Sequence, residues 1–278
     1  MSYRLALAGA SVAITGGGRG IGRAAAARLA AAGARVAIGD IDLAAARDAA
    51  AVADARAFPL DVTDLGSVRE FVAEAERACG PLDALVANAG LLPLGPFVDT
   101  DPAVHRRTVE VNLLGPINCA HAALPGMIAR GRGRLVIVAS LMGRITVAGA
   151  AVYGGTKHGV LALAETLREE LRPSGVEVVS VLPPIVHTDA SSGVEEGRVI
   201  PAVEPEDVAA AIVSACERGG EEISVPRWAG PIARAGGALP PALLRPVRWA
   251  LRGDRAMHSL DAGERAAYAE RLRRDATR

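Results

Sequence analysis

The chain has 278 residues and half of them are hydrophobic, which suits one large α/β domain with an appendage or two small domains. Only 3% of the residues are aromatic, so the core must consist mainly of Ala, Val, Leu and Ile. The 31 basic and 31 acidic side chains balance to a formal net charge of zero, which argues against a nucleic-acid partner held by a positive field.

The cysteines and the apolar runs bear on the cellular location. Cys79, Cys119 and Cys216 are far apart and odd in number, which argues against a disulfide framework and favours the reducing cytoplasm. No charge-free apolar run of 18 or more residues occurs, and no basic segment precedes a long apolar one at the N-terminus. We therefore expect a cytoplasmic protein without a signal peptide or membrane span, and we predict no metal site.

A glycine-rich turn follows the first expected strand, residues 11–15, and leads into an Ala-rich helix that ends near Ala32. A second strand over residues 35–39 completes a βαβ unit, an arrangement that places a pyrophosphate at the helix N-terminus. The glycine spacing differs from the usual G-x-G-x-x-G. The turn reads Gly16-Gly17-Gly18-Arg19-Gly20-Ile21-Gly22.

Asp40 ends the second strand, about 20 residues after the glycines. A carboxylate there can accept hydrogen bonds from both hydroxyls of an adenosine ribose and repels a 2′-phosphate, which favours NAD over NADP. Arg19 points weakly toward NADP. As an alternative, Asp40 could cap the next helix, although Asp42 is better placed for that.

Strands and helices continue to alternate, which predicts a doubly wound parallel sheet of about seven strands flanked by helices. Asn112 lies within one long expected helix, where Asn is unfavourable, so it should bend that helix or hold a buried water. We expect strands over residues 55–60, 82–87, 134–139, 177–182 and 222–225, and helices over residues 43–54, 64–79, 101–130, 150–171 and 205–218.

Lys157 is the only lysine of the chain, which suggests chemistry that needs a compact ammonium rather than a guanidinium. On a helix, Tyr153 and Lys157 are four residues apart and share one face. A neighbouring ammonium favours the ionised phenol, so we expect Lys157 to lower the pKa of Tyr153 from about 10 toward about 7. The alternative is a chance spacing within a helix.

These residues together resemble the short-chain dehydrogenase/reductase family, over about residues 11–225. The glycine turn resembles the cofactor turn of the family. Asn88-Ala89-Gly90 resembles its Asn-Asn-Ala-Gly motif, with Ala87 in place of the first Asn. Asn112, Ser140, Tyr153 and Lys157 resemble its catalytic tetrad in order and spacing.

The resemblance implies a role for each tetrad residue. Tyr153 is implied to be the general acid/base, Lys157 to lower its pKa and hold the nicotinamide ribose, Ser140 to orient the substrate oxygen, and Asn112 to hold a water in a proton path. It implies that a dinucleotide contacts Gly16, Gly18, Arg19, Gly20, Ile21, Gly22, Asp40, Asp61, Val62, Asn88, Ala89, Gly90, Tyr153, Lys157, Val186 and Thr188.

One departure concerns the turn after the sixth strand, where the family usually has Pro-Gly-x-Val-x-Thr and this chain has Pro183-Pro184-Ile185-Val186-His187-Thr188. Proline at 184 fixes φ and stiffens the turn. A polar contact in the pocket is one interpretation of His187, and an exposed loop position is the other. We interpret His158 as structural.

The expected substrate pocket has apolar walls, residues 91–97 and 141–143, and a mobile lid, residues 189–200. No lysine or arginine cluster lies in these segments, which makes a phosphorylated or CoA-linked substrate less favoured. We therefore expect a small hydrophobic alcohol or ketone as the substrate.

The C-terminal residues are expected to form a helical extension, residues 229–278, beside a catalytic and dinucleotide-binding domain, residues 1–228. Residues 242–252 and 262–274 are expected to be helical. A basic amphipathic helix can contact a membrane surface, cover a partner or the substrate mouth, or simply pack on its own domain.

The sequence therefore predicts an NAD(H)-dependent oxidoreductase that interconverts a hydrophobic secondary alcohol and its ketone, as a homodimer or homotetramer. The alternatives are a non-catalytic dinucleotide-binding redox sensor and an NADP-linked ketoreductase. An epimerase or dehydratase on this fold is less favoured, because it usually carries a longer substrate domain.

Overall fold

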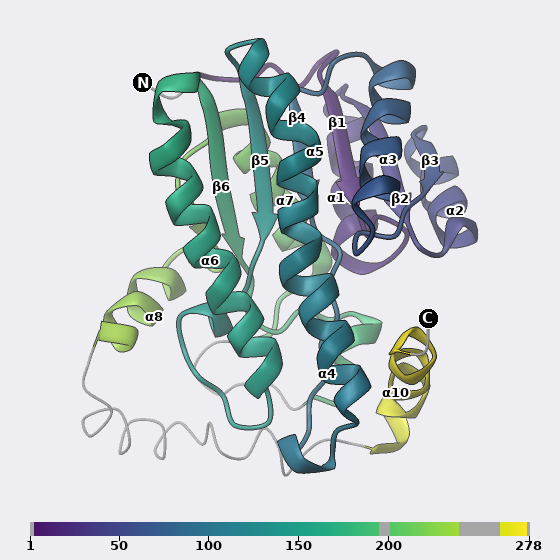
Figure 1. Ribbon diagram of the computed structural model, residues 1–278, viewed down its shortest axis with the longest axis vertical. Coiled ribbons are helices and arrows are strands. Elements are labelled where there is room, and N and C mark those ends of the chain that lie inside the picture. Colours follow the sequence, from purple (N-terminus) through teal and green to yellow (C-terminus); the bar gives the residue numbers. More distant parts are fainter. Residues whose placement is uncertain (1–2, 195–200, 239–261, 277–278) are drawn as a thin grey trace.

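The computed structural model describes residues 3–194, 201–238 and 262–276. A seven-stranded sheet runs through its centre in the order β3-β2-β1-β4-β5-β6-β7, and every neighbouring pair is parallel (Figure 1). The predicted doubly wound sheet is therefore confirmed. Its strands are β1 (Ser11–Thr15), β2 (Arg35–Asp40), β3 (Arg56–Pro59), β4 (Ala84–Ala87), β5 (Gly133–Val138), β6 (Val176–Leu182) and β7 (Glu222–Ser224).

Helices cover both faces of the sheet, which explains why the central strands are apolar almost without interruption. Ala13 of β1 faces the core under α3, α5 and α6, while Val12 and Ile14 face the core under α1, α2 and α7. The main helices are α1 (Gly20–Ala31), α2 (Leu43–Ala53), α3 (Leu65–Cys79), α4 (Pro102–Val109), α5 (Gly115–Ala129), α6 (Ala151–Leu171) and α7 (Pro205–Arg218).

Carboxylates begin several of these helices by accepting hydrogen bonds from otherwise unpaired backbone N–H groups. Asp42 accepts from Ala45 at the start of α2, as expected, and Asp64 and Asp101 do the same for α3 and α4. Each helix therefore starts directly after the loop that leaves the carboxyl end of a strand. These loops form the functional edge of the sheet.

The single helix expected over residues 101–130 is interrupted. A π-helical turn, Glu110–Leu114, separates α4 from α5, and the fully buried Asn112 lies within it. The wider turn lets the Asn112 side chain bond a neighbouring loop instead of its own helix. The helix is thus irregular at Asn112, where it forms a π-bulge, a feature often found at functional sites, and the predicted bend itself stays a prediction.

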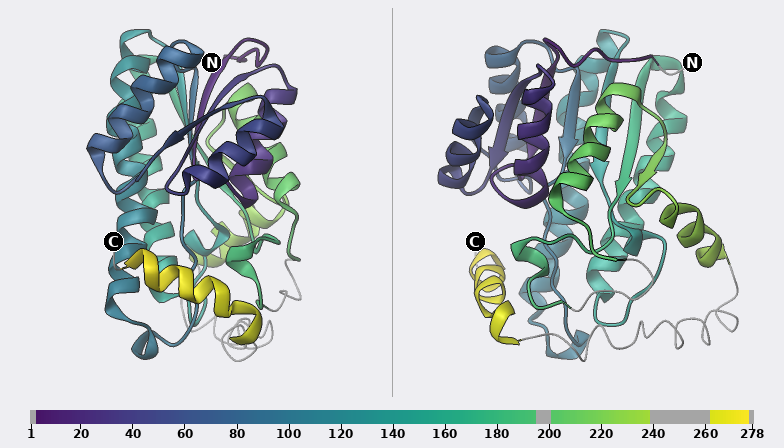
Figure 2. Two further views of the ribbon diagram at one scale, coloured as in Figure 1. Left: turned by 90° about the vertical axis from the view of Figure 1, so that its right-hand side faces the viewer. Right: turned by 180° about the vertical axis from the view of Figure 1, so that it is seen from behind.

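Two helices follow the sheet. α8 (Ala229–Ala238) was not predicted, and it packs Ala229 and Ala233 into the main core. α10 (Ala262–Ala276) agrees with the helix expected over residues 262–274 and lies beyond the carboxyl ends of the strands, next to α4 (Figure 2). The helix expected over residues 242–252 lies outside the described residues. The division at residue 228 stays a prediction.

The described helices do not include one that is both long enough and apolar enough to span a lipid bilayer.

Candidate active site

The glycine turn between β1 and α1 depends on missing side chains. Gly16 and Gly20 have positive φ of 63° and 48°, a region that favours glycine. A Cβ at Gly16 would lie 2.7 Å from Cα of Ala89, and one at Gly22 would lie 2.2 Å from the carbonyl oxygen of Gly16. The turn therefore leaves open space at the N-terminus of α1 only if these positions stay glycine, which fits a bound pyrophosphate.

Asn88 fastens the loop after β4 to this turn. Its Nδ2 donates to the carbonyl oxygens of Thr15 (3.0 Å) and Gly16 (2.9 Å), and its backbone N–H donates to the Thr15 hydroxyl. Asn88 thus acts mainly by holding two loops together. Its neighbours Ala89 and Gly90 then form the floor of the cleft beside the turn.

Asp40 lies at the end of β2 and reaches back to the turn. One of its carboxylate oxygens accepts from Gly18 N–H (2.9 Å) and the other from Asp42 N–H (3.0 Å). Each oxygen retains a lone pair, so the carboxylate can still accept two ribose hydroxyls. Arg19 donates to Asp42 at 2.7 Å and is therefore engaged away from a 2′-phosphate position.

Asp61 and Val62 follow β3 at the same edge. Burial acts to raise the pKa of the Asp61 carboxyl, but hydrogen bonds from Thr63 and Arg107 outweigh it, so this pKa lies below its usual value. Arg107 holds the loop from α4, with 3.2 Å between its Nη2 and Oδ2 of Asp61.

The tetrad residues come from three parts of the fold, the π-turn with Asn112, the turn after β5 with Ser140, and α6 with Tyr153 and Lys157. Asn112 accepts from Leu91 N–H (2.7 Å) and donates to its carbonyl (2.8 Å). Lys157 is buried in α6, and its Nζ donates to the carbonyl of Val138 (2.9 Å). Ser140 caps the turn after β5 and hydrogen-bonds Tyr153. The structure therefore brings Ser140, Tyr153 and Lys157 together.

The expected electrostatic effect on Tyr153 is wrong for this structure. Burial raises the pKa of Tyr153 to about 12, and the hydrogen bond with Ser140 opposes this rise only in part. The Lys157 ammonium lies 5.7 Å from the ring centroid and is held by Val138, while burial lowers the pKa of Lys157 itself to about 8. At neutral pH the phenol is thus a protonated donor beside a mostly charged lysine.

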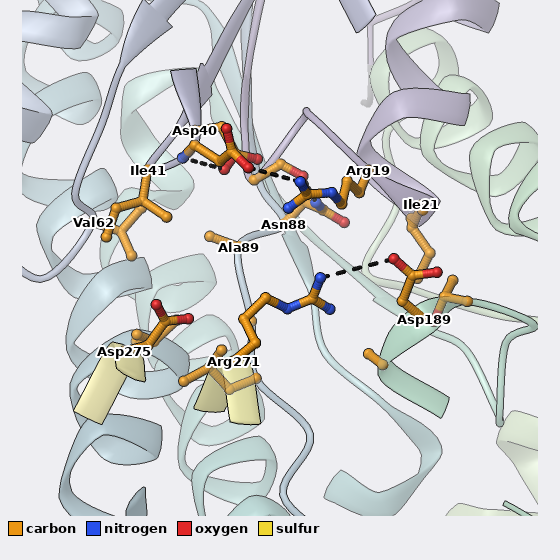
Figure 3. Close-up of a pocket in the computed structure, with 18 of the residues that line it drawn as sticks. Arg19, Ile21, Asp40, Ile41, Val62, Asn88, Ala89, Asp189, Arg271 and Asp275 are labelled. Carbon is orange, nitrogen blue, oxygen red and sulfur yellow. Dashed lines mark hydrogen bonds and ion pairs between the residues drawn. The ribbon is translucent and has the colours of Figure 1, made fainter. Parts of the chain in front are cut away.

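A cleft of about 930 Å³ runs along the strand ends beside these residues, within the size range of small-molecule sites (Figure 3). His187 also lines the cleft, half-exposed and paired with Glu204 at 2.6 Å. The predicted cofactor residues that line it are Gly16, Arg19, Gly20, Ile21, Asp40, Asp61, Val62, Asn88, Ala89, Gly90 and Thr188.

Other predicted residues support the cleft from behind. Gly18 bonds Asp40, Gly22 packs under the turn, and Val186 is buried. Tyr153 borders a separate small cavity with Phe97, Thr100 and His105. The structure thus has a large cleft of a size that suits a dinucleotide and a much smaller cavity beside Tyr153.

Sequence reasoning missed the contribution of α10. Tyr268, Arg271, Arg274 and Asp275 line the cleft opposite the glycine turn. The expectation about arginines concerned only the segments nearest the tetrad, and the arginines that α10 brings to the cleft lie outside those segments. The Arg-rich composition of residues 262–274 was the available signal, but it did not show where this helix packs.

Comparisons with known proteins agree with this geometry. A family model described as short chain dehydrogenase matches residues 10–198, which is more than half of the chain. The chain therefore belongs to the short-chain dehydrogenase family. Sorbitol dehydrogenase of Cereibacter sphaeroides is 39% identical over 192 residues, which cover 68% of this chain and 75% of that protein.

Two further matches mark the extent of the similarity. Dehydrogenase/reductase SDR family member 7B of Rattus norvegicus is 34% identical over 131 residues, which cover 47% of this chain and only 40% of that protein. A crystal structure of 3-ketoacyl-(acyl-carrier-protein) reductase from Brucella melitensis complexed with NADH matches with a TM-score of 0.71 and 27% identity. That match covers 80% of this chain and 99% of the other.

Proposed function

We propose that this protein is an NAD(H)-dependent oxidoreductase that interconverts a hydrophobic secondary alcohol and its ketone. The observation that carries the proposal is that Ser140, Tyr153 and the buried Lys157 lie together next to a cleft with a glycine turn at one side. The similarity to a sorbitol dehydrogenase and to a reductase complexed with NADH supports a dinucleotide and a hydroxyl or carbonyl substrate.

The residues present fit a dinucleotide, because the turn at the start of α1 keeps its shape only with glycine at positions 16 and 22, where an added Cβ would clash with Ala89 and with the Gly16 carbonyl oxygen. Gly20 and Ile21 offer the helix N-terminus to a diphosphate, Asp40 offers acceptors to the adenosine ribose, and Val62 offers an apolar contact to the adenine. When bound, the nicotinamide supplies or accepts the hydride.

In the reducing direction, Tyr153 donates its phenol proton to the substrate oxygen as the carbonyl carbon gains a hydride. Ser140 orients that oxygen through its hydroxyl. A phenol with a pKa of about 12 is an available donor at neutral pH. To act as a base in the oxidising direction, Tyr153 must first lose its phenol proton. This ionisation costs about 1.4 kcal/mol of free energy for each unit by which its pKa exceeds the solution pH.

The substrate side stays close to the sequence-based expectation. The segment from Pro93 to Phe97 borders Tyr153, which favours an apolar substrate. His105 adds one polar group to this wall, because its ring stacks on Phe97 at 4.8 Å and its buried Nδ1 has no hydrogen-bond partner.

The decisive experiment replaces the acid. Tyr153→Phe removes the transferable proton and retains the ring, so it should lower kcat by at least about a hundredfold, the usual contribution of a general acid. The dissociation constant for NADH, measured by fluorescence titration, should stay within about threefold of the wild-type value. Such a change corresponds to less than about 1.4 kcal/mol of binding free energy. A panel of hydrophobic alcohols and ketones identifies the substrate first, by absorbance of NADH. Retained turnover in Tyr153→Phe would contradict the mechanism.

A further inference from the structure

The face of α10 that lines the cleft is regular. Tyr268, Arg271 and Asp275 are spaced by three and four residues, so they lie on one side of the helix over two turns. Figure 3 shows this side opposite the glycine turn, with the Arg271 guanidinium directed into the space below Arg19 and Ile21. α10 therefore forms a second wall along the cleft, which the matched family segment, residues 10–198, does not include.

This wall is anchored rather than loosely laid on the surface. The buried guanidinium of Arg265 donates to the carbonyl of Leu92 (2.6 Å) and to those of Ala190 and Ser192 (3.2 Å each). The Tyr268 hydroxyl accepts from Leu92 N–H at 2.8 Å. Both loops beside the substrate end are thus bonded to α10, and the position of Arg271 over the cleft follows from this anchoring.

Among the described residues of the cleft lining outside α10, no unpaired cation is available to bind a diphosphate at the glycine turn. A diphosphate at the start of α1 carries two negative charges, and the carboxylates of Asp40, Asp42 and Asp189 are among those that line the same cleft. Arg19 is engaged by Asp42 at 2.7 Å, and Arg107 is engaged by Asp61 on the far side. Both of these arginines are thus already paired with carboxylates of the cleft lining.

Arg271 also lines the cleft and can supply a positive charge to a diphosphate there. Its Nη1 is 3.8 Å from Oδ2 of Asp189, and the Asp189 side chain is 72% exposed, so this pair is weak. The guanidinium also lies 5.1 Å from the Tyr268 ring centroid, which keeps its stem over the cleft. A diphosphate accepts two parallel hydrogen bonds from a guanidinium and would compete successfully with one solvated carboxylate.

We propose that Arg271, on the C-terminal helix α10, binds the diphosphate of the dinucleotide. When the cofactor enters, the ion pair of Arg271 with Asp189 is replaced by hydrogen bonds to the phosphate oxygens. α10 and the glycine turn then clamp the diphosphate from opposite sides. This inference rests on the proposed use of a dinucleotide, and it adds a binding residue that the glycine turn and Asp40 do not supply.

The test compares ligands with and without the diphosphate by calorimetric titration of the full chain. Arg271→Gln should raise the dissociation constants of NADH and ADP-ribose about tenfold to a hundredfold, as expected for the loss of hydrogen bonds between charged groups. Adenosine, which lacks phosphate, should bind both proteins equally. Arg273→Gln is the matched control, because Arg273 lies on the same helix, is exposed and pairs only with Glu270 among the interactions described.

A second variant makes the result independent of any damage to α10. Asp189→Asn removes the competing carboxylate and should tighten NADH and ADP-ribose at least twofold while leaving adenosine unchanged. Binding of ADP-ribose by Arg271→Gln within twofold of the wild type overturns the proposal, as does an equal loss of adenosine. If the wild type binds neither NADH nor ADP-ribose, the proposed function itself fails.

Discussion

The preference for NAD over NADP is expected to depend mainly on one carboxylate, that of Asp40. Both of its oxygens already accept backbone N–H groups, from Gly18 and Asp42, so its position is set by the turn and not by a ligand. A negative charge held this firmly repels a 2′-phosphate. The nearest cation, Arg19, is turned to Asp42 and does not offset that repulsion.

Neutralising this charge should therefore shift cofactor preference. Asp40→Asn keeps the shape of the side chain and one acceptor oxygen, and we expect the ratio of kcat/KM for NADPH to that for NADH to rise at least about tenfold, one step of 1.4 kcal/mol. Asp42→Asn, which releases Arg19, should raise the ratio further in the double variant. An unchanged ratio in both variants would remove the ribose argument.

The burial of Lys157 can be tested through the pH dependence of the free energy of unfolding. Its pKa is lowered to about 8 in the folded protein, against 10.5 for an unperturbed lysine. Between these values the unfolded chain binds more protons, so Lys157 makes the free energy of unfolding rise with pH. Stability from this group is complete above 10.5 and lost as the pH falls through about 8.

Lys157→Met removes the titration while keeping the length of the side chain. Urea unfolding of wild type and variant at pH 7 and pH 10 should show the difference in stability moving in favour of the wild type at the higher pH. The change should reach a few kcal/mol, at about 1.4 kcal/mol per pKa unit. A difference that does not vary with pH would show that the ammonium is solvated.

At the scale of the element, replacing glycine by alanine has different consequences in the glycine turn and in α6. A Cβ at Gly22 would lie 2.2 Å from the Gly16 carbonyl oxygen and 2.7 Å from Nδ2 of Asn88. A Cβ at Gly155, in the interior of α6, would meet no atom within 4 Å. The same substitution therefore has opposite effects at the two positions.

Gly22→Ala should lower the free energy of unfolding by about 1–3 kcal/mol, as overpacking does, and should abolish NADH binding by displacing the turn. Gly155→Ala should raise it by about 0.5–1 kcal/mol, because alanine favours a helix interior over glycine. Thermal unfolding and NADH titration of both variants measure these effects. Wild-type NADH affinity in Gly22→Ala would contradict the close packing of the turn.

At the scale of the molecule, α10 connects residues that are far apart in the chain. Arg265 is buried, and its guanidinium donates to backbone carbonyls of the loops at Leu92 and at Ala190–Ser192. Burial lowers the pKa of Arg265, and the nearby Tyr268 opposes this shift without cancelling it. We also propose that the protein self-associates, and Val109, Leu114 and Ile128 of the α4–α5 region are apolar side chains that are exposed in the single chain.

Removing the anchor should loosen the wall without unfolding the sheet. Arg265→Gln should speed amide hydrogen exchange in residues 262–276 and 189–192 about tenfold or more, because hydrogen bonds from a charged donor are lost. Exchange in β4, β5 and β6 should stay unchanged. Arg273→Gln serves again as the control, and equal exchange in both variants would mean that α10 is held by other contacts.

The sequence by itself determined the alternation of strands and helices, the glycine turn, Asp40 and the Tyr153–Lys157 pair. Each of these signals is contained in a short segment, where spacing and side-chain chemistry are readable. Only the tertiary structure decided that α10 lines the cleft, since this depends on Arg265 reaching carbonyls more than 70 residues away in sequence. It also decided the direction in which the pKa of Tyr153 moves, because burial is a property of the packed fold and here outweighs the lowering effect of Ser140.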